Sequence, residues 1–475
     1  MDDSGRGEGG PGRTDPAGGP PPRGGSGARP GAAKAAGLRG RLGSAAREGP
    51  PGPSRPGFWR SPLRGPWLTS VLGLVLLAGV AVVFTTGLLS YAAYNPDLAP
   101  VNDTTPDKGL LGFYLFDWPT DPHWLYRLTQ GLHVTLGVVL VPVLLAKLWS
   151  VIPKLFTWPP VRSAAHALER LSLLLLVGGA VFQFATGLLN VQLTYLFPGS
   201  FYRLHFYGAW VFIAALAVHV ALRLRVVVRA LRTRGRDTGP LPPAARPSPA
   251  VRGGTGLEAV RPAPATVSRR GALGIVGLGS LTLFAVTAGQ SIGGPLRETA
   301  LLAPRGRTPG TGTGPNGFQV NKTTAGAGVS PSDIGPDWRL TVRGGGRERV
   351  LDRADLLELA QRSAELPIAC VEGWSTTDQE WSGVRLSDLA ALVGARSGDG
   401  GPPGVMVESV QREGAFRSAA LRANQVRDPR SLLALRVNGA DLSPDHGFPA
   451  RVIVPANPGV HNTKWVGRLT FGGLT

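Results

Sequence analysis

Five long apolar runs in the first two-thirds of the chain constrain its fold more than any other feature. They cover residues 67–90, 128–146, 171–191, 204–222 and 271–289. Each is close to the ~20 residues that an α-helix needs to cross the hydrocarbon core of a bilayer. The first four therefore predict transmembrane helices, and the fifth, which is weaker and rich in Gly and Ser, predicts one more.

Charges beside these runs predict how the helices are oriented. Lys147 and Lys154 lie at the end of the second run and a group of arginines begins at Arg223 after the fourth, whereas the segment 95–121 carries five aspartates. Because basic residues are enriched in cytoplasmic loops, the N-terminus is expected in the cytoplasm. Five crossings of the cytoplasmic membrane then place everything after residue 290 outside the cytoplasm.

The composition indicates segments that do not belong to a folded domain. The chain has a formal net charge of +19, 67 glycines and 43 prolines. Residues 1–66 have few large apolar side chains and are expected to form a disordered basic arm in the cytoplasm. Nucleic-acid binding is disfavoured because membrane orientation already explains the basic charge. Residues 231–267 predict a cytoplasmic linker, and residues 291–315 a Gly/Thr/Pro-rich tether.

A repeat divides the first four runs into two similar halves. The sequence FTTGLL at 84–89 returns as FATGLL at 184–189, and LYRL at 125–128 returns as FYRL at 201–204. A duplicated helical hairpin predicts a four-helix transmembrane bundle over residues 67–230.

Histidines inside the apolar runs are the candidate site of this bundle, because ionisable groups in a membrane are costly. His205 and His219 are 14 residues apart in one run, so they lie about 21 Å apart on nearly one helix face, with room for two haems. His133 and His205 are both expected near the outer ends of their helices and could bind one iron from opposite sides. Two hydrogen-bonded interfacial histidines are the alternative. The candidate partner of His219 at an inner haem, His166, lies about 15 Å off its level.

With these histidines, residues 62–231 resemble the di-haem cytochrome b family, which includes the membrane subunits of nickel-iron hydrogenases and formate dehydrogenases. The resemblance implies haem b and electron exchange with a membrane quinone. In that family the inner haem takes its second ligand from the first helix, just before a Trp, where this chain has Pro66. The expected number of haems is therefore one, or two if His166 serves as the missing ligand.

The fifth run begins with SRRGAL at 268–273, which resembles a twin-arginine export signal within the chain. Such export moves folded cargo, as a domain carrying a cofactor made in the cytoplasm would require. Ordinary positive-inside charges are the alternative. Residues 268–290 are predicted to form the fifth transmembrane helix, and cleavage after it stays open.

The remaining residues, 316–475, are long enough for one domain of the α+β class. Strand-like runs at 338–344, 404–410, 432–439 and 450–456 alternate with helical stretches at 353–362 and 386–393. Cys370, the single cysteine, follows the apolar sequence LPIA. By itself, a lone cysteine is more often a small buried hydrophobe than a metal ligand.

Sequence motifs around Cys370 and near the C-terminus favour a metal ligand instead. Cys370 precedes a Gly-Trp pair, and residues 432–471 contain NG..L..DHGFP.R..VP and a closing Lys-Trp in that order. These motifs resemble the sulfite oxidase family of molybdenum enzymes, and within it the catalytic subunit type of periplasmic methionine sulfoxide reductase. The resemblance implies a molybdopterin cofactor whose molybdenum is bound by the Cys370 thiolate, a soft ligand suited to such a metal.

Further site residues follow from this resemblance by position. It implies that His446 and Arg451 contact the pterin and its phosphate, with further phosphate contacts from Asn462, Thr463 and Lys464. Looser matches add Asn321, Thr324 and Ser409. Without the flanking motif, Arg451 would be interpreted as a strand-surface charge and His446 as a turn residue.

Two departures from sulfite oxidases bear on the expected function. The basic stretch that follows their ligand cysteine is replaced here by VEGWSTTDQE, and the chain ends at Thr475, before an immunoglobulin-like dimerisation domain could follow. We therefore expect a monomeric membrane-anchored oxidoreductase that transfers an oxygen atom and two electrons to or from a small extracytoplasmic substrate. Reduction of a sulfoxide-like substrate by quinol through haem is favoured. The alternatives are a sulfite-type oxidase and a cofactor-free, anchored binding or sensor module.

Overall fold

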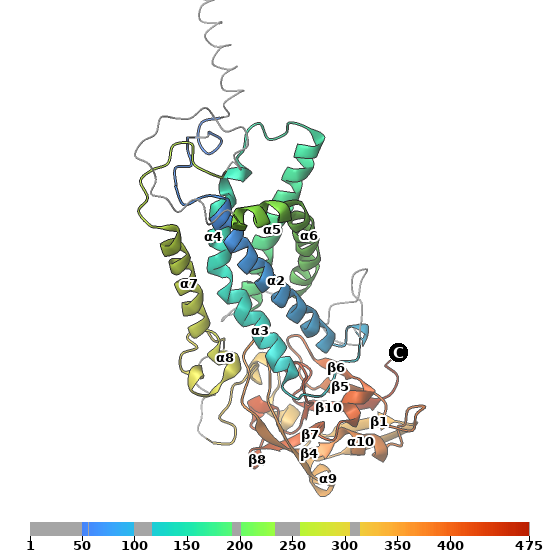
Figure 1. Ribbon diagram of the computed structural model, residues 1–475. Helices are drawn as coiled ribbons and strands as arrows, with labels where there is room; N and C mark the ends of the chain where they lie inside the picture. Colours follow the sequence, from blue (N-terminus) through green and yellow to red (C-terminus); the bar gives the residue numbers. More distant parts are fainter. Residues whose placement is uncertain are drawn as a thin grey trace, which may run out of the picture.

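The computed structural model describes residues 50–55, 57–98, 116–191, 201–232, 257–304 and 314–474. Most of the expected arm, most of the linker 231–267 and part of the tether 291–315 lie outside these residues. Figure 1 shows a helical part and, at one end of it, a smaller part that contains all the labelled strands.

Long helices form the first part, as the sequence predicts. They are α2 (Pro66–Ala93), α3 (Leu125–Val139), α4 (Val141–Leu155), α5 (Ala164–Asn190), α6 (Tyr202–Arg232), α7 (Arg269–Ala285) and the short α8 (Gly289–Ile292). Among the described residues, four helices are long and apolar enough to cross a membrane: α2, α5, α6 and the segment Arg269–Ile292. A fifth is added if α3 and α4 form one span, bent by 41°. Pro142 at the start of α4 lacks a backbone donor, which explains a break there.

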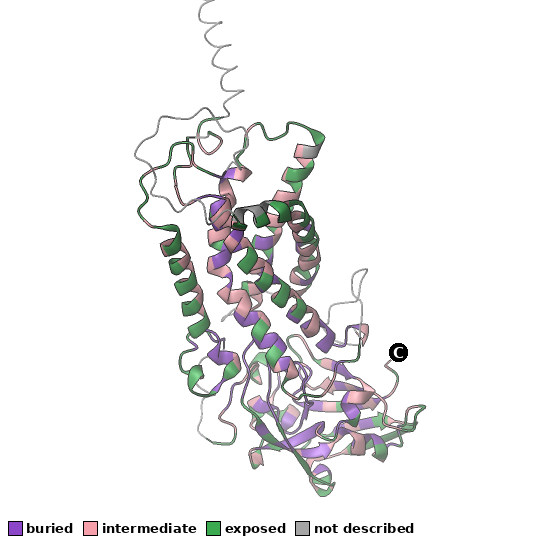
Figure 2. Cartoon of the chain, in the orientation of Figure 1, coloured by how far each residue is buried: buried purple, intermediate pink, exposed green. Residues whose placement is uncertain are grey.

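The helices pack into a bundle with an apolar centre. One buried cluster takes Val80 from α2, Leu144 from α4, Ala180 from α5 and Phe212 from α6. Helix α7 packs beside α3 and α4 and turns Ile275, Leu278 and Leu281 outward, each more than 60% exposed. Figure 2 shows this outer face in green, whereas purple residues dominate the strands of the second part. The bundle thus presents an apolar exterior.

Two five-stranded sheets and three short helices make up the second part, in agreement with a domain that mixes helices and strands. Its strands are β1 (Leu340–Gly344), β2 (Arg347–Leu351), β3 (Arg362–Leu366), β4 (Gln379–Arg385), β5 (Val405–Ser409), β6 (Ser418–Leu421), β7 (Leu432–Val437), β8 (Ala440–Asp441), β9 (Arg451–Ile453) and β10 (Val466–Phe471). The helices are α9 (Arg353–Glu358), α10 (Leu386–Leu392) and α11 (Ala423–Arg427).

One sheet has the order β2-β1-β10-β5-β6, and the other has the order β3-β4-β7-β8, with β9 also paired to β7. Strands β1 and β10 run parallel. Because β1 begins the domain and β10 ends it, this pairing ties the two ends of the domain together. The main apolar core contains residues from both sheets and from α9, α10 and α11, including Leu340, Leu433 and Leu469.

Candidate active site of the strand-containing domain

Cys370 lies in a tight loop between β3 and β4. Its backbone N–H donates to the Trp374 carbonyl (2.8 Å), and the Gly373 N–H donates back to the Cys370 carbonyl (3.0 Å). Gly373 has φ +90°, a conformation that a residue with a side chain adopts only under strain. The loop holds Cys370 almost fully buried. Its thiol lies 3.8 Å from Oε2 of Glu372, which also accepts a hydrogen bond from the Trp374 indole at 2.8 Å.

The residues that the sequence assigns to the pterin phosphate come together on two loops. His446 ends a short 3-10 helix, Pro444–His446, and Arg451 begins β9. The Arg451 guanidinium donates to the carbonyls of His446 (3.0 Å) and Asn462 (3.1 Å). Lys464 Nζ donates to the Asp445 carbonyl at 2.9 Å. The structure therefore places His446, Arg451, Asn462, Thr463 and Lys464 in one cluster, since 462–464 are consecutive.

The three looser assignments lie at the edge of this cluster. The Thr324 hydroxyl donates to Asp445 Oδ1 (3.0 Å), and the Ser409 hydroxyl donates to the Lys464 carbonyl (2.7 Å). Asn321 is next to Lys322, whose carbonyl accepts a hydrogen bond from Lys464. Ser409 therefore contacts the central group directly, whereas Thr324 and Asn321 reach it through Asp445 and Lys322.

Burial of positive charge in this cluster fits an anionic cofactor. Burial lowers the pKa of Arg451 to about 9. The pKa of Lys464 falls well below its ordinary value, first through burial and then through the Arg451 charge, and Cys370 is among the groups close enough to act on it. A buried cation is costly without a counter-charge. A phosphate would supply that charge and the acceptors that both side chains need.

Several buried polar atoms in and beside this cluster lack a hydrogen-bond partner in the part of the chain that the structure describes. Among the described residues, no hydrogen-bond partner lies near Arg451 Nε, Asn462 Nδ2, Thr463 Oγ1 or either ring nitrogen of His461. Buried polar atoms are nearly always satisfied, so a group of them indicates a bound molecule. The sequence analysis did not assign His461, although its position beside the Asn462–Lys464 stretch was a signal. Burial lowers the pKa of His461 to about 4, so it is neutral at physiological pH. Together these residues fit a molybdopterin.

Comparison with known proteins agrees with this fit. Residues 327–473 match the family model described as an oxidoreductase molybdopterin binding domain. The strand-containing domain is therefore a molybdopterin-binding oxidoreductase domain, related to sulfite oxidase and nitrate reductase.

The individual relatives each match less than a third of this chain. The chain is 31% identical over 157 residues to mitochondrial sulfite oxidase of Mus musculus, covering 28% of this chain and 29% of that protein. It is 37% identical over 99 residues to the NADH nitrate reductase of Ulva prolifera, covering 19% and 11%. The crystal structure of the sulfane dehydrogenase from Paracoccus pantotrophus aligns with 25% identity and a TM-score of 0.26, covering 29% of this chain and 38% of that chain. This chain thus spans less than a third of these two curated relatives.

Candidate haem site of the helical part

The rings of His133 on α3 and His205 on α6 face each other across the bundle. Their centroids are 6.2 Å apart, with an angle of 86° between the ring planes. When two imidazoles bind one metal ion from opposite sides, the distance between their ring centroids is the sum of two bonds of about 2 Å each and the distance from each ring centre to its nitrogen. The observed separation fits that requirement.

Hydrogen bonds at Nδ1 leave the other ring nitrogen of each histidine available. His133 Nδ1 donates to the Val83 carbonyl (2.9 Å). His205 Nδ1 lies 2.9 Å from the Thr186 hydroxyl, whose own proton is donated to the Phe182 carbonyl (2.7 Å). Because both acceptors have no proton to give, each Nδ1 carries the hydrogen and each Nε2 keeps its lone pair. This is the tautomer that a metal ligand requires.

The repeated motif supplies these supports in both halves of the bundle. Thr86 and Thr186 occupy the same place in FTTGLL and FATGLL, and Thr86 Oγ1 lies 3.3 Å from His133 Nδ1. The glycines that follow make room, because a Cβ on Gly87 would lie 3.0 Å from the His133 ring, and one on Gly187 3.3 Å from the His205 ring. The sequence analysis noted the repeat but did not assign these four residues to the histidines.

The two residues considered for an inner haem are not brought together in the same way. Among the described residues, no ring contact joins His219 to His166 as one joins His133 to His205. His166 lies in the first turn of α5, where its backbone N–H donates to the Ser163 side chain that caps the helix. Of these two candidate pairs, His133 and His205 are thus the one whose rings are in contact among the described residues.

Contact between the two parts

The Cys370 loop lies directly against the end of the helical bundle. The Gln130 side chain on α3 donates to the Val371 carbonyl at 2.5 Å. On the other side, the Ser375 N–H donates to the Gln290 carbonyl and its hydroxyl donates to the Ser291 carbonyl, each at 2.9 Å. The backbone that carries the candidate molybdenum ligand is thus held by α3 and α8.

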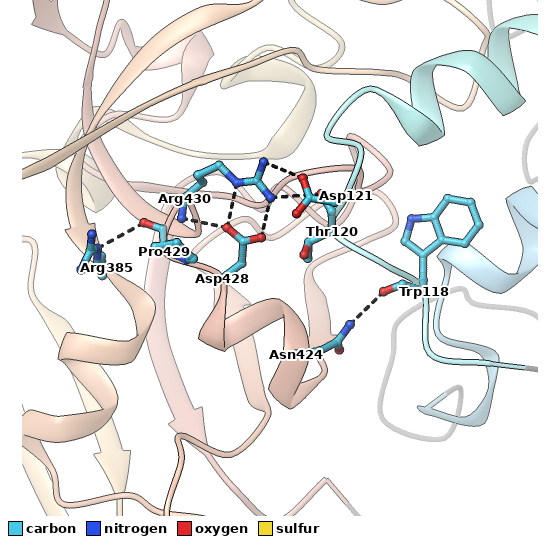
Figure 3. Close-up of polar contacts among 8 residues, drawn as sticks. All are labelled: Trp118, Thr120, Asp121, Arg385, Asn424, Asp428, Pro429 and Arg430. Atoms are coloured by element: carbon cyan, nitrogen blue, oxygen red, sulfur yellow. Dashed lines mark hydrogen bonds and ion pairs between the residues drawn. The ribbon is translucent and has the colours of Figure 1, made fainter.

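Charged residues fix the domain around this contact. Arg430 binds both Asp428 and Asp121 (2.9 Å), and Asn424 donates to the Trp118 carbonyl (2.9 Å; Figure 3). Arg422 pairs with Asp97 and with Asp117 (3.0 Å). Aspartates of the segment 95–121, which the sequence indicated only as an outer loop, therefore bind arginines of the oxidoreductase domain. Asp103 and Asp107 lie outside the described residues.

Proposed function

We propose that this chain is a membrane-anchored molybdenum oxidoreductase that exchanges electrons with the quinone pool through a b-type haem. The observation that carries the proposal is the position of the Cys370 loop. It rests on α3 within one helical turn of His133, so a molybdenum site and a haem site would be neighbours in one molecule.

Residues of both sites have separate tasks in this proposal. Cys370 would bind the molybdenum, while Arg451 and Lys464 would offset the charge of the pterin phosphate. His133 and His205 would hold the haem, each oriented through its Nδ1 hydrogen bond. When bound, the molybdenum cofactor supplies oxygen-atom and two-electron chemistry and the haem supplies one-electron transfer. The chain itself positions the two groups and excludes water from the space between them.

Location in the cytoplasmic membrane, with the oxidoreductase domain outside the cytoplasm, is part of the proposal. Support comes from the long apolar helices, from the outward-facing apolar side chains of α7 and from the basic residues at the opposite end of the bundle. A charged or polar helix exterior would be expected if the bundle were surrounded by water.

Reduction of a sulfoxide-like substrate is the favoured direction. Glu372 lies beside the Cys370 thiol, and basic residues do not follow the cysteine directly as they do in sulfite oxidases. A carboxyl group at this point offers no attraction to an anionic substrate such as sulfite, whereas a neutral oxide tolerates it. The relation to sulfite oxidases favours the second candidate, oxidation of sulfite or a related donor with electrons moving inward.

The first test is elemental analysis of the detergent-purified full-length protein from a host that makes molybdenum cofactor. We expect one molybdenum per chain and one iron, or two if His219 also holds a haem. The same sample decides the direction of electron flow. In a reductase, a sulfoxide should oxidise the dithionite-reduced haem. In a sulfite oxidase, sulfite should reduce the oxidised haem. A preparation that contains iron but no molybdenum would favour the cofactor-free binding or sensor module and contradict the proposal.

Replacing the candidate metal ligand tests its assignment. Cys370→Ser should abolish turnover and leave the haem absorbance at its wild-type value, because a hydroxyl is a poor substitute for a thiolate on a soft metal. The substitution Ser397→Ala, at a half-buried position of the same domain far from the Cys370 loop in sequence, serves as a control for losses during purification. Unchanged turnover of Cys370→Ser would rule out Cys370 as the essential ligand.

A further inference from the structure

Each candidate haem histidine has, one helical turn before it, a residue on a path of contacts between the bundle and the oxidoreductase domain. On α3 this residue is Gln130, three positions before His133, and on α6 it is Tyr202, three positions before His205. We propose that these two residues, with Tyr94, form the electron route between the molybdenum site and the haem. This inference rests on the proposed function and adds the residues through which its two sites communicate.

The first branch runs through a hydrogen bond to the metal-binding loop. Gln130 is buried, and its amide nitrogen donates to the carbonyl of Val371, the residue bonded to Cys370. Its amide oxygen accepts from Ser90 on α2 at 2.6 Å, which fixes the orientation of the amide. A short series of covalent bonds and one hydrogen bond therefore joins Cys370 to the helix turn that carries His133.

The second branch runs through aromatic rings. His461, whose ring nitrogens are unsatisfied among the described residues, packs edge-on to Tyr94, with centroids 5.4 Å apart. Tyr94 in turn lies 5.7 Å from Tyr202, between ring centroids. Tyr94 is almost fully buried. Rings in contact thus extend from the expected cofactor pocket to the helix turn that carries His205.

Both branches approach the same haem position from the side that faces the oxidoreductase domain. Electron transfer slows steeply with separation, and it slows less across bonded or closely packed atoms than across a gap. The two contacts replace a gap between the domains by a continuous path. Since both parts belong to one chain and are held by ion pairs, electrons need no diffusing carrier between them.

The electron count of the proposed reductase is balanced along this route. A quinol would supply two electrons and release two protons, and a haem held by His133 and His205 would pass the electrons on one at a time. Two electrons delivered to the molybdenum site, with two protons, convert the substrate's oxygen to water and leave the reduced substrate. In the oxidase direction the same route would carry both electrons from the molybdenum site to the haem.

The decisive experiment follows reoxidation of the haem in the full-length holoenzyme. The haem is reduced with a quinol analogue, excess sulfoxide is added, and its absorbance is recorded by stopped flow. We expect Tyr94→Leu and Gln130→Leu each to slow reoxidation several-fold, because each removes one of the two paths of contacting atoms. Tyr94→Phe keeps the ring and should retain the wild-type rate.

Two further readouts separate loss of the route from damage to either site. Turnover driven by reduced viologen, which delivers electrons to the molybdenum site without the haem, should be unchanged in Tyr94→Leu. The haem midpoint potential, titrated in protein made without molybdenum, should also stay at the wild-type value. If either changes with the rate, the slowing reflects a damaged site, and the route is rejected.

A matched interface variant completes the test. Asn424→Ala removes the hydrogen bond to the Trp118 carbonyl, which also joins the two parts but lies on neither branch. Equal slowing by Asn424→Ala would show that a looser interface between the two parts is responsible, and would overturn the route. Wild-type rates in both leucine variants would also overturn it. A wild-type protein without haem or molybdenum, or one whose haem is not reoxidised, would instead reject the proposed function.

Discussion

At the scale of single residues, buried groups without a partner and side chains that restrict a neighbour identify both sites. The Arg451 and Lys464 charges and the unsatisfied His461 nitrogens indicate an anion that is large enough to reach all of them. In the bundle, Thr186 and Gly187 have complementary effects on His205, since one fixes the ring nitrogen and the other allows the ring to approach. In the proposed haem site, these contacts would preorganise His205 as a ligand.

Removing the hydroxyl acceptor should weaken the haem site without removing a ligand. Thr186→Val preserves the shape of the side chain but leaves His205 Nδ1 without its acceptor. Loss of such a supporting hydrogen bond typically lowers affinity for a bound metal group by about 10- to 100-fold. We expect a lower ratio of haem to protein after purification, measured from the haem absorbance and the protein concentration.

Thr129→Val is the matched control for this prediction. Thr129 is also buried in a bundle helix, but its hydroxyl donates to the Tyr126 carbonyl rather than to a histidine. It should retain the wild-type haem content. An equal loss in both variants would mean that helix packing, and not the support of His205, controls haem binding.

At the scale of elements, local sequence patterns predicted the type of a segment, helix or strand, better than its length. The four strand-like runs contain β1, β5, β7 and β9, and both helical stretches contain a helix. The stretch 353–362 was too long, because α9 ends at Glu358 and the chain from Arg362 pairs with β4. Strands β2, β3, β4, β6, β8 and β10 were missed, since pairing with other strands, rather than their own pattern, holds them extended.

The loop that carries Cys370 fits against α3 only because Gly373 has no side chain. A Cβ at this position would lie 2.7 Å from Cβ of Val134, and the backbone there has φ +90°. Gly373→Ala should therefore destabilise the domain by about 1–3 kcal/mol through strain and overpacking. Thermal unfolding in detergent, followed by tryptophan fluorescence, measures this effect.

Gly346→Ala provides the control for backbone strain alone. Gly346 has φ +76° in the turn between β1 and β2, and no atom lies within 4 Å of the position that its Cβ would take. We expect a smaller loss of stability than for Gly373→Ala, and an unchanged haem reoxidation rate. Similar losses in the two variants would argue against a tight fit between the Cys370 loop and α3.

At the scale of the whole molecule, the end of the bundle that carries Ala93 and Tyr126 forms one interface with the oxidoreductase domain. Ion pairs surround an apolar contact in which Ala93, Trp118 and Tyr126 from the helical part meet Ala369. The Trp118 indole donates to the Ala456 carbonyl at 2.8 Å. Contacts of this kind keep the domain in a fixed position relative to the histidines of the bundle.

Arg422→Gln should loosen this interface because it leaves Asp97 and Asp117 without their shared cation. Both Arg422 and Asp97 have small exposed fractions, 16% and 20% of their side chains. The loss should therefore exceed the ~1 kcal/mol typical of exposed pairs. Faster release of the oxidoreductase domain by limited proteolysis, assayed on gels at low and high salt, would measure the loss.

The exposed pair between Arg436 and Asp441 supplies a control within the oxidoreductase domain. Arg436→Gln should leave the rate of proteolytic release at its wild-type value. Release at the same rate from the wild-type protein, Arg422→Gln and Arg436→Gln would contradict a role for the Arg422 pairs in holding the domain.

The sequence by itself determined the division into an apolar helical part and a molybdopterin-binding oxidoreductase domain, because hydropathy, turn residues and motif order are properties of neighbouring residues. It also indicated Cys370, Arg451 and Lys464 as a group. The sequence likewise indicated His133 and His205 as a pair. Tertiary structure alone decided how Thr86 and Thr186 support these histidines and where the Cys370 loop meets α3. These relations depend on packing between segments far apart in the chain, which no local pattern encodes.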